Sequence, residues 1–180
     1  MTKALLVIDY TNDFVAPDGK LTCGEPGQAI EGKITELIES FVVDGQYVFF
    51  ANDIHFENDL YHPETKLFPP HNIAGTTGRE LYGTVKDAYE KYKNTVMSFD
   101  KTRYSSFAGT NLHQLLAERG VKEVHLVGVC TDICVLHTAV DAYNLGYKII
   151  VYKDGVASFN AAGHEWALTH FTGSLGATVI

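Results

Sequence analysis

The sequence predicts an α/β fold in which a mostly parallel, six-stranded sheet carries helices on both faces, giving three layers. Short apolar runs alternate with amphipathic segments along the whole chain of 180 residues. The runs at 4–9 (ALLVID) and 123–129 (EVHLVGV) are continuous rather than alternating, which indicates strands buried on both sides. Strand and helix alternation of this kind is typical of a parallel sheet. The length favours a single domain over residues 1–180.

The first half of the chain predicts two strands, a helix and two long loops. Residues 4–9 form the first strand, and residues 10–27 contain the Asn, Asp, Pro and Gly residues of a loop. Residues 30–43 place apolar side chains at helical spacing and end before a glycine. Residues 46–52 form the second strand. The polar segment 56–78 follows, and a loop of that length in a compact domain is usually functional.

The second half continues the alternation without a repeat or a linker. Its predicted helices, of which the first has the weakest apolar stripe, cover residues 79–92, 110–119, 131–145 and 160–171. Its predicted strands cover residues 94–99, 123–129, 147–152 and 177–180. In open α/β sheets ligands bind beyond the carboxyl ends of the strands, so the polar residues at those ends carry the information about function.

Composition narrows the class of protein. The net charge of −8 and the pI of about 5.4 argue against broad binding to nucleic acid or to anionic membranes. No apolar run approaches the roughly 20 residues that span a bilayer, and the N-terminus lacks a signal-peptide layout. Three cysteines do not make a disulfide framework. We therefore expect a cytoplasmic protein with reduced thiols and a small-molecule substrate.

A thiol, a carboxylate and an amine follow three of the predicted strands. Cys134 lies in the first turn of the helix after the fourth strand, where the helix N-terminus lowers the pKa of a thiol. Asp9 ends the first strand and Lys101 follows the third. If these strands are neighbours, Asp9 can accept the thiol proton and Lys101 can hold the resulting charge. The residue types alone leave an inert buried cysteine, a capping acid and a solvated lysine equally open.

Three longer motifs resemble those of the isochorismatase-like cysteine hydrolases, in the same order along the chain. They are DYTNDF at 9–14, with Thr11 in place of the usual Gln, KTRYSSFAGTNL at 101–112 and GVCTDICVLHTA at 128–139. The resemblance implies the isochorismatase-like fold and a catalytic triad of Asp9, Lys101 and Cys134. It also implies a cis peptide between Val129 and Cys130, with the N–H groups of residues 130 and 134 forming an oxyanion hole.

A metal-binding pattern points to one branch of this family. Asp53 and His55 are two residues apart on an extended segment and so face the same side. Most such pairs bind nothing, but D-x-H followed by a downstream P-H resembles the nicotinamidase (pyrazinamidase) branch. That resemblance implies Asp53, His55 and His71 as ligands of one divalent ion, with Glu64 or water as the fourth. Zinc is expected first, with iron or manganese as alternatives; His62 is a weaker candidate.

The branch resemblance implies hydrolysis of nicotinamide, and of pyrazinamide as a related amide, to the acid and ammonia through a thioester on Cys134. This reaction belongs to NAD salvage. The metal can hold the pyridine nitrogen and orient the carboxamide. Three aromatic residues lie beside the motifs and can enclose the ring of the substrate: Phe14, Phe68 and Tyr104. Many family members have Trp where this chain has Phe68. Family members are often dimers or tetramers, so a homo-oligomer is expected.

Three alternatives stay open at this point. Another enzyme of the superfamily, acting on an N-carbamoyl or ureido compound, needs the same thiol but not the metal pattern. A redox module built on Cys130 and Cys134 needs neither Asp9 nor Lys101. A metal-binding domain without catalysis needs no reactive thiol. Ammonia release from nicotinamide, measured with and without a chelator, separates these hypotheses.

Overall fold

The computed structural model describes residues 2–180, so Met1, the first residue of the predicted domain, lies outside the described residues. Within that range one sheet runs in the order β3-β2-β1-β4-β5-β6, and every pairing is parallel. The strands are β1 (Lys3–Ile8), β2 (Tyr47–Asp53), β3 (Met97–Lys101), β4 (Glu123–Val129), β5 (Lys148–Ala157) and β6 (Thr178–Val179). The predicted six-stranded α/β fold is confirmed.

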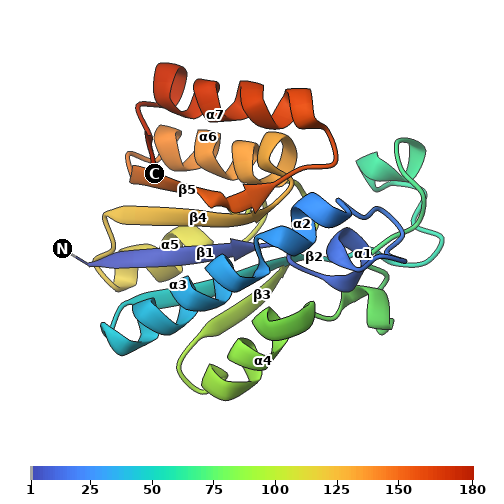
Figure 1. Cartoon of the computed structure of the whole chain (residues 1–180), viewed down its shortest axis with the longest axis horizontal. Coiled ribbons are helices and arrows are strands. Elements are labelled where there is room, and N and C mark those ends of the chain that lie inside the picture. The colour runs from blue at the N-terminus through green and yellow to red at the C-terminus, as the bar shows by residue number, and fades with distance from the viewer. Residues whose placement is uncertain (1) are drawn as a thin grey trace.

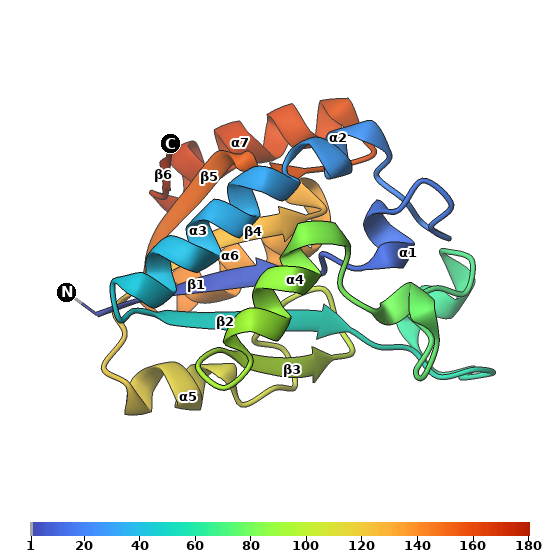
Figure 2. The ribbon, with the colours of Figure 1, turned by 60° about the horizontal axis from the view of Figure 1, so that its bottom comes forward.

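Helices cover both faces of this sheet (Figures 1 and 2). The helices on one face are α1 (Asn12–Val15), α2 (Glu25–Ala29), α3 (Glu31–Val43) and α4 (Gly83–Tyr92). The helices on the other are α5 (Leu112–Glu118), α6 (Leu136–Asn144) and α7 (Ala161–Leu175). No helix between residues 2 and 180 is both long enough and apolar enough to cross a membrane.

The central strand β1 explains why the predicted strands are continuously apolar. Leu5 and Val7 pack into the hydrophobic core under α3 and α4, while Leu6 and Ile8 pack into the core under α5, α6 and α7. Successive side chains of a strand point to opposite faces, and here both faces are covered. The strand therefore has no polar face.

Two predicted segments differ from the structure. The loop predicted at 10–27 contains α1 and α2, which have four and five residues and are too short to show an apolar stripe. The helix predicted from residue 79 begins at Gly83, because Thr77–Arg79 forms a 3₁₀ turn, η2, and Leu81 makes an antiparallel bridge to Thr11. A second 3₁₀ turn, η1 (Pro63–Lys66), interrupts the predicted loop at 56–78.

Candidate active site

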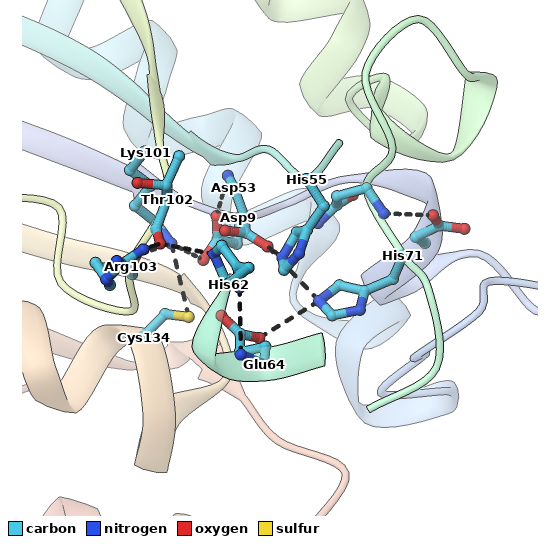
Figure 3. A network of polar contacts seen from close by, with 12 residues as sticks. Asp9, Asp53, His55, His62, Glu64, His71, Lys101, Thr102, Arg103 and Cys134 are labelled. Atoms are coloured by element: carbon cyan, nitrogen blue, oxygen red, sulfur yellow. Dashed lines mark hydrogen bonds and ion pairs between the residues drawn. The ribbon is translucent and has the colours of Figure 1, made fainter. Parts of the chain in front are cut away.

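The polar side chains at the strand ends converge at the carboxyl edge of the sheet, as Figure 3 shows. Asp9 follows β1, Asp53 ends β2 and Lys101 ends β3. Cys134 lies in η3 (Thr131–Val135), a turn of π-helix that follows β4. All four side chains are buried. Parallel strands thus bring together residues that are up to 125 positions apart (Asp9 to Cys134).

Lys101 joins the predicted acid and the predicted thiol. Its ammonium nitrogen lies 2.7 Å from Asp9 Oδ2 and 3.7 Å from Cys134 Sγ, and it donates to the carbonyl of Arg103 at 3.1 Å. Asp9 Oδ1 accepts the backbone N–H of Asp53 at 2.7 Å. The first and third strands are not neighbours, because β2 lies between them. The long side chain of Lys101 reaches across the end of β2 to make the contact.

The buried trio has a defined charge state at neutral pH. Burial raises the pKa of Asp9 to about 6, although the ammonium of Lys101 works against this shift. Burial alone would lower the pKa of Lys101, but the negative charges around it, that of the Asp9 carboxylate first and that of Asp53 after it, together outweigh burial and the pKa rises. The pair therefore rests as carboxylate and ammonium. Burial, reinforced by the carboxylate of Asp9, raises the pKa of Cys134 well above its usual range, so its thiol rests neutral.

The expectation that a helix N-terminus lowers the pKa of Cys134 is therefore wrong. Cys134 is only 6% exposed, and it lies within a π-helical turn rather than in the first turn of a regular α-helix. Desolvation of a fully buried thiolate outweighs the partial positive charge of the helix end. The thiol needs a proton acceptor at hand, and Asp9 is the carboxylate that can supply it.

The turn before Cys134 directs a second thiol to the opposite face of the sheet. Gly128 has a φ of +116°, and a Cβ there would collide with the carbonyl of Ile8, so only glycine fits. The peptide between Val129 and Cys130 is cis, as the family resemblance implies. Cys130 Sγ lies 3.3 Å from Cys23 Sγ in the core under α3, whereas Cys134 belongs to the core on the other face.

The contact of Cys23 with Cys130 could not be predicted from the sequence. Cys23 lies 107 positions before Cys130, and no motif links the two. All three cysteines are free and buried. The thiol partner of Cys130 is Cys23 rather than Cys134, which removes the geometric basis of a redox module on residues 130 and 134.

A second group of buried side chains adjoins the trio. Asp53, His55, Glu64 and His71 each offer one ligand atom, and these atoms lie within 4.8 Å of one another. His71 Nε2 is 3.6 Å from Asp53 Oδ2 and 3.5 Å from Glu64 Oε2. In the described part of the chain Asp53 Oδ1 and His71 Nε2 are buried without a hydrogen-bond partner. Buried acceptors left unpaired in a compact set of carboxylate and imidazole groups fit a divalent cation.

Hydrogen bonds fix the tautomers of two histidines in this region. His71 Nδ1 lies 2.8 Å from the carbonyl of Pro69 and donates to it, which leaves the Nε2 lone pair for a cation. His62 Nδ1 accepts the backbone N–H of Glu64 at 3.2 Å, and its Nε2 donates to the carbonyl of Thr102 at 2.8 Å. Both nitrogens of His62 are thus engaged, and this weaker ligand candidate positions Glu64 instead.

Two of the three aromatic candidates, Phe14 and Phe68, lie beside the metal-ligand candidate His71, and the third, Tyr104, packs against His137. The rings of Phe14 and Phe68 lie 5.3 and 6.2 Å from the ring of His71, centroid to centroid. Burial, with a contribution from the carboxylate of Glu64, raises the pKa of Tyr104 to about 12. A cleft of about 490 Å³ opens beside the metal-ligand candidates, and Phe68 and His71 are among the residues that line it.

A neutral thiol, an ionised carboxylate–ammonium pair and a group of metal-ligand candidates share one edge of a parallel sheet. Together with the parallel sheet flanked by helices, these features define a hydrolase of the cysteine-nucleophile class.

Comparison with known proteins identifies the family. The family model "Isochorismatase domain" matches residues 3–180. The uncharacterized isochorismatase family protein PncA of Bacillus subtilis (strain 168) is 61% identical over 181 residues, 99% of each chain. A crystal structure of nicotinamidase/pyrazinamidase PncA from Bacillus subtilis has a TM-score of 0.97 and 58% identity, covering 99% of both chains. The pyrazinamidase of Pyrococcus horikoshii in complex with zinc has a TM-score of 0.86 and 31% identity, covering 100% of this chain and 99% of that one. The chain belongs to the isochorismatase family.

Proposed function

We propose that this protein is a metal-dependent nicotinamidase, which hydrolyses nicotinamide to nicotinate and ammonia and so serves NAD salvage. The observation that carries the proposal is the contact of Lys101 with both Asp9 and Cys134, at the edge where four metal-ligand candidates gather. The thiol machinery accounts for the cleavage of an amide. The cation site and the aromatic side chains account for an aromatic heterocycle as substrate. The relatives named nicotinamidase and pyrazinamidase support both parts.

Acylation begins with transfer of the thiol proton of Cys134 to Asp9. The thiolate attacks the carboxamide carbon, and the carbonyl oxygen becomes an oxyanion that accepts the backbone N–H groups of residues 130 and 134. The carbon–nitrogen bond breaks as Asp9 returns its proton to the departing ammonia, which leaves a thioester on Cys134. Lys101 remains beside both groups and stabilises whichever of them carries the negative charge.

In deacylation the same residues act again, with water as the nucleophile and Cys134 as the leaving group. Asp9, again a carboxylate, takes a proton from water as the water oxygen attacks the thioester carbon. The carbon–sulfur bond breaks, nicotinate leaves, and the proton returns to the sulfur of Cys134. One acid/base residue with a pKa of about 6 can serve both half-reactions near neutral pH.

Asp53, His55, Glu64 and His71 would hold one divalent ion, and zinc suits this set of nitrogen and carboxylate donors. Bound there, the ion supplies a Lewis acid for the pyridine nitrogen. Phe14, Phe68 and Tyr104 would enclose the ring and exclude water around the carboxamide.

The experiment that tests the proposal is ammonia release from nicotinamide by the zinc-loaded protein, its chelator-treated form and the Cys134→Ala variant. We expect the zinc-loaded protein to turn over nicotinamide and the variant to lose at least roughly 1,000-fold, because the variant lacks the thiol that lies beside Lys101 and Asp9. Chelation is expected to suppress turnover and added zinc to restore it. Native rates in Cys134→Ala would contradict the assignment of the nucleophile. An N-carbamoyl substrate tested in parallel covers the nearest alternative, which makes no use of the cation site.

The assembly and the location of the protein are further parts of the proposal. The family resemblance predicts a dimer or tetramer, and the composition predicts a cytoplasmic location. Light scattering on the purified chain tests the first, and cell fractionation tests the second.

A further inference from the structure

Asn72 follows the ligand candidate His71 directly and has an unusual backbone conformation. Its φ is +46°, in the left-handed region that residues with a side chain rarely adopt, Asn more readily than most. Its backbone N–H donates to Asp13 Oδ2 at 2.7 Å, and its side-chain oxygen accepts from Thr11 Oγ1 at 2.9 Å. Its carbonyl accepts the backbone N–H of His55 at 3.0 Å. These three bonds hold the residue that links the two histidines.

Asp13 is committed to this task by its surroundings. It is 7% exposed, and its second carboxylate oxygen accepts the backbone N–H of Lys20 at 3.2 Å. The backbone of Gly78 closes over the carboxylate so tightly that a Cβ at that position would collide with it. Each oxygen of Asp13 therefore accepts a backbone N–H.

Thr11 is fully buried and stands where the motif of the family usually has Gln. Its backbone bridges to Leu81, and its hydroxyl is directed to Asn72. Thr11 and Asp13 lie in the same six-residue stretch as Asp9 and Phe14, and the ring of Phe14 packs on His71. This short stretch thus carries the proposed base at one end and contacts the cation site at the other.

We propose that Thr11 and Asp13 are positioning residues for the cation site, acting through Asn72 on His71 and His55. The inference rests on the proposed function, because it takes those histidines as metal ligands. Ligating imidazoles keep their orientation only when the groups around them are fixed, and loss of a group bonded directly to a ligand typically costs about 10- to 100-fold in metal affinity or activity. The segment 9–13 therefore sets where the ring of the substrate is anchored relative to Cys134.

Three variants test the proposal. Thr11→Val keeps the approximate shape of the side chain and removes the hydroxyl, and Thr11→Ser keeps the hydroxyl as the matched control. Asp13→Asn keeps the shape, but an amide has one acceptor oxygen and cannot receive both N–H groups. Zinc affinity is measured on the metal-free full chain by competition with a chromophoric chelator. We expect zinc binding to weaken about 10-fold or more in Thr11→Val and Asp13→Asn, and to stay near the native value in Thr11→Ser.

Thermal unfolding of the metal-free proteins separates positioning from a merely structural role. A lower melting temperature with native zinc affinity in Thr11→Val and Asp13→Asn would overturn the proposal, as would a native chain that binds no zinc. Ammonia release at saturating zinc is recorded separately. If the native protein binds zinc but hydrolyses no nicotinamide, the proposed function fails, while the affinities still decide whether Thr11 and Asp13 position the site.

Discussion

Two thiols four residues apart, those of Cys130 and Cys134, lie on opposite faces of the sheet. One has charged neighbours and the other has apolar neighbours. Cys134 Sγ lies 3.7 Å from the ammonium of Lys101, beside the carboxylate of Asp9. Cys130 Sγ lies 3.3 Å from the thiol of Cys23, in an apolar core. The cysteines are equally buried, at 6% and 5% exposure.

The comparison shows that the pKa at rest does not identify the nucleophile. Burial raises the pKa of Cys134, and the contact with Cys23 together with burial raises that of Cys130. Both thiols are therefore neutral before substrate arrives. Cys134 differs because an acceptor for its proton and a cation for its charge are already in place, and Cys130 has neither.

Among the changes that test this comparison of Cys134 with Cys130, replacement of Lys101 should have the largest effect. In Lys101→Met the carboxylate of Asp9 is left buried without its partner. We expect kcat for nicotinamide to fall roughly 100- to 1,000-fold, the usual cost of losing one charge-stabilising group. We also expect the free energy of unfolding to fall by about 3–5 kcal/mol, because a buried charge loses its counterion. Steady-state kinetics and urea unfolding measure the two effects.

The double variant Asp9→Asn/Lys101→Met is the control for stability. It removes both charges, so it should regain most of the lost unfolding free energy while remaining inactive. A single Lys101→Met variant as stable and as active as the native protein would show that the ion pair is not the device that distinguishes Cys134.

The pH dependence of activity tests the role of Asp9 as the base that activates Cys134. The pKa of Asp9 is raised to about 6, so its carboxyl group gains a proton at a higher pH than an ordinary Asp does. The proposed base must be ionised, and kcat/KM should therefore fall as pH drops through about 6, approaching tenfold for each unit below it. The profile is measured at saturating zinc, with circular dichroism at each pH to follow folding. A profile with no acid limb in a protein that stays folded would contradict the role given to Asp9.

Much of the fold could be predicted because hydrophobic patterns report burial. The strand at 123–129 was predicted with the bounds the structure has, since both of its faces are covered and all of its residues are buried. The short helices α1 and α2 could not be found in this way, because four or five residues do not complete an apolar stripe. The extent of β5 was missed because Lys153 and Asp154 interrupt its apolar run before it resumes.

The site was predictable where strand ends dictate position. Asp9, Lys101 and Cys134 come together because parallel strands end at one edge, which their positions at predicted strand ends indicate, although the order of the strands cannot be read from the sequence. The pairing of Cys23 with Cys130 depends on how a loop packs on the sheet, which no local pattern encodes. The left-handed Asn72 and its bonds to Thr11 and Asp13 are likewise tertiary contacts between segments 59 to 61 residues apart. The pKa of Cys134 differs in direction from the sequence-based expectation, because the degree of burial cannot be read from a helix start.

The smallest effect is expected from replacing Cys130, the thiol in the apolar core. Cys130→Ala removes a thiol that contacts Cys23 and leaves the backbone N–H of residue 130 in place. We expect kcat/KM to change by less than about threefold and the unfolding free energy to fall by about 1 kcal/mol, the typical cost of a small change in a core. Cys23→Ala should behave alike, because it empties the other side of the same contact. Kinetics and urea unfolding of both variants check this. A loss of activity in Cys130→Ala comparable to that of Lys101→Met would mean that the sulfur itself, and not only the backbone at residue 130, takes part in the reaction.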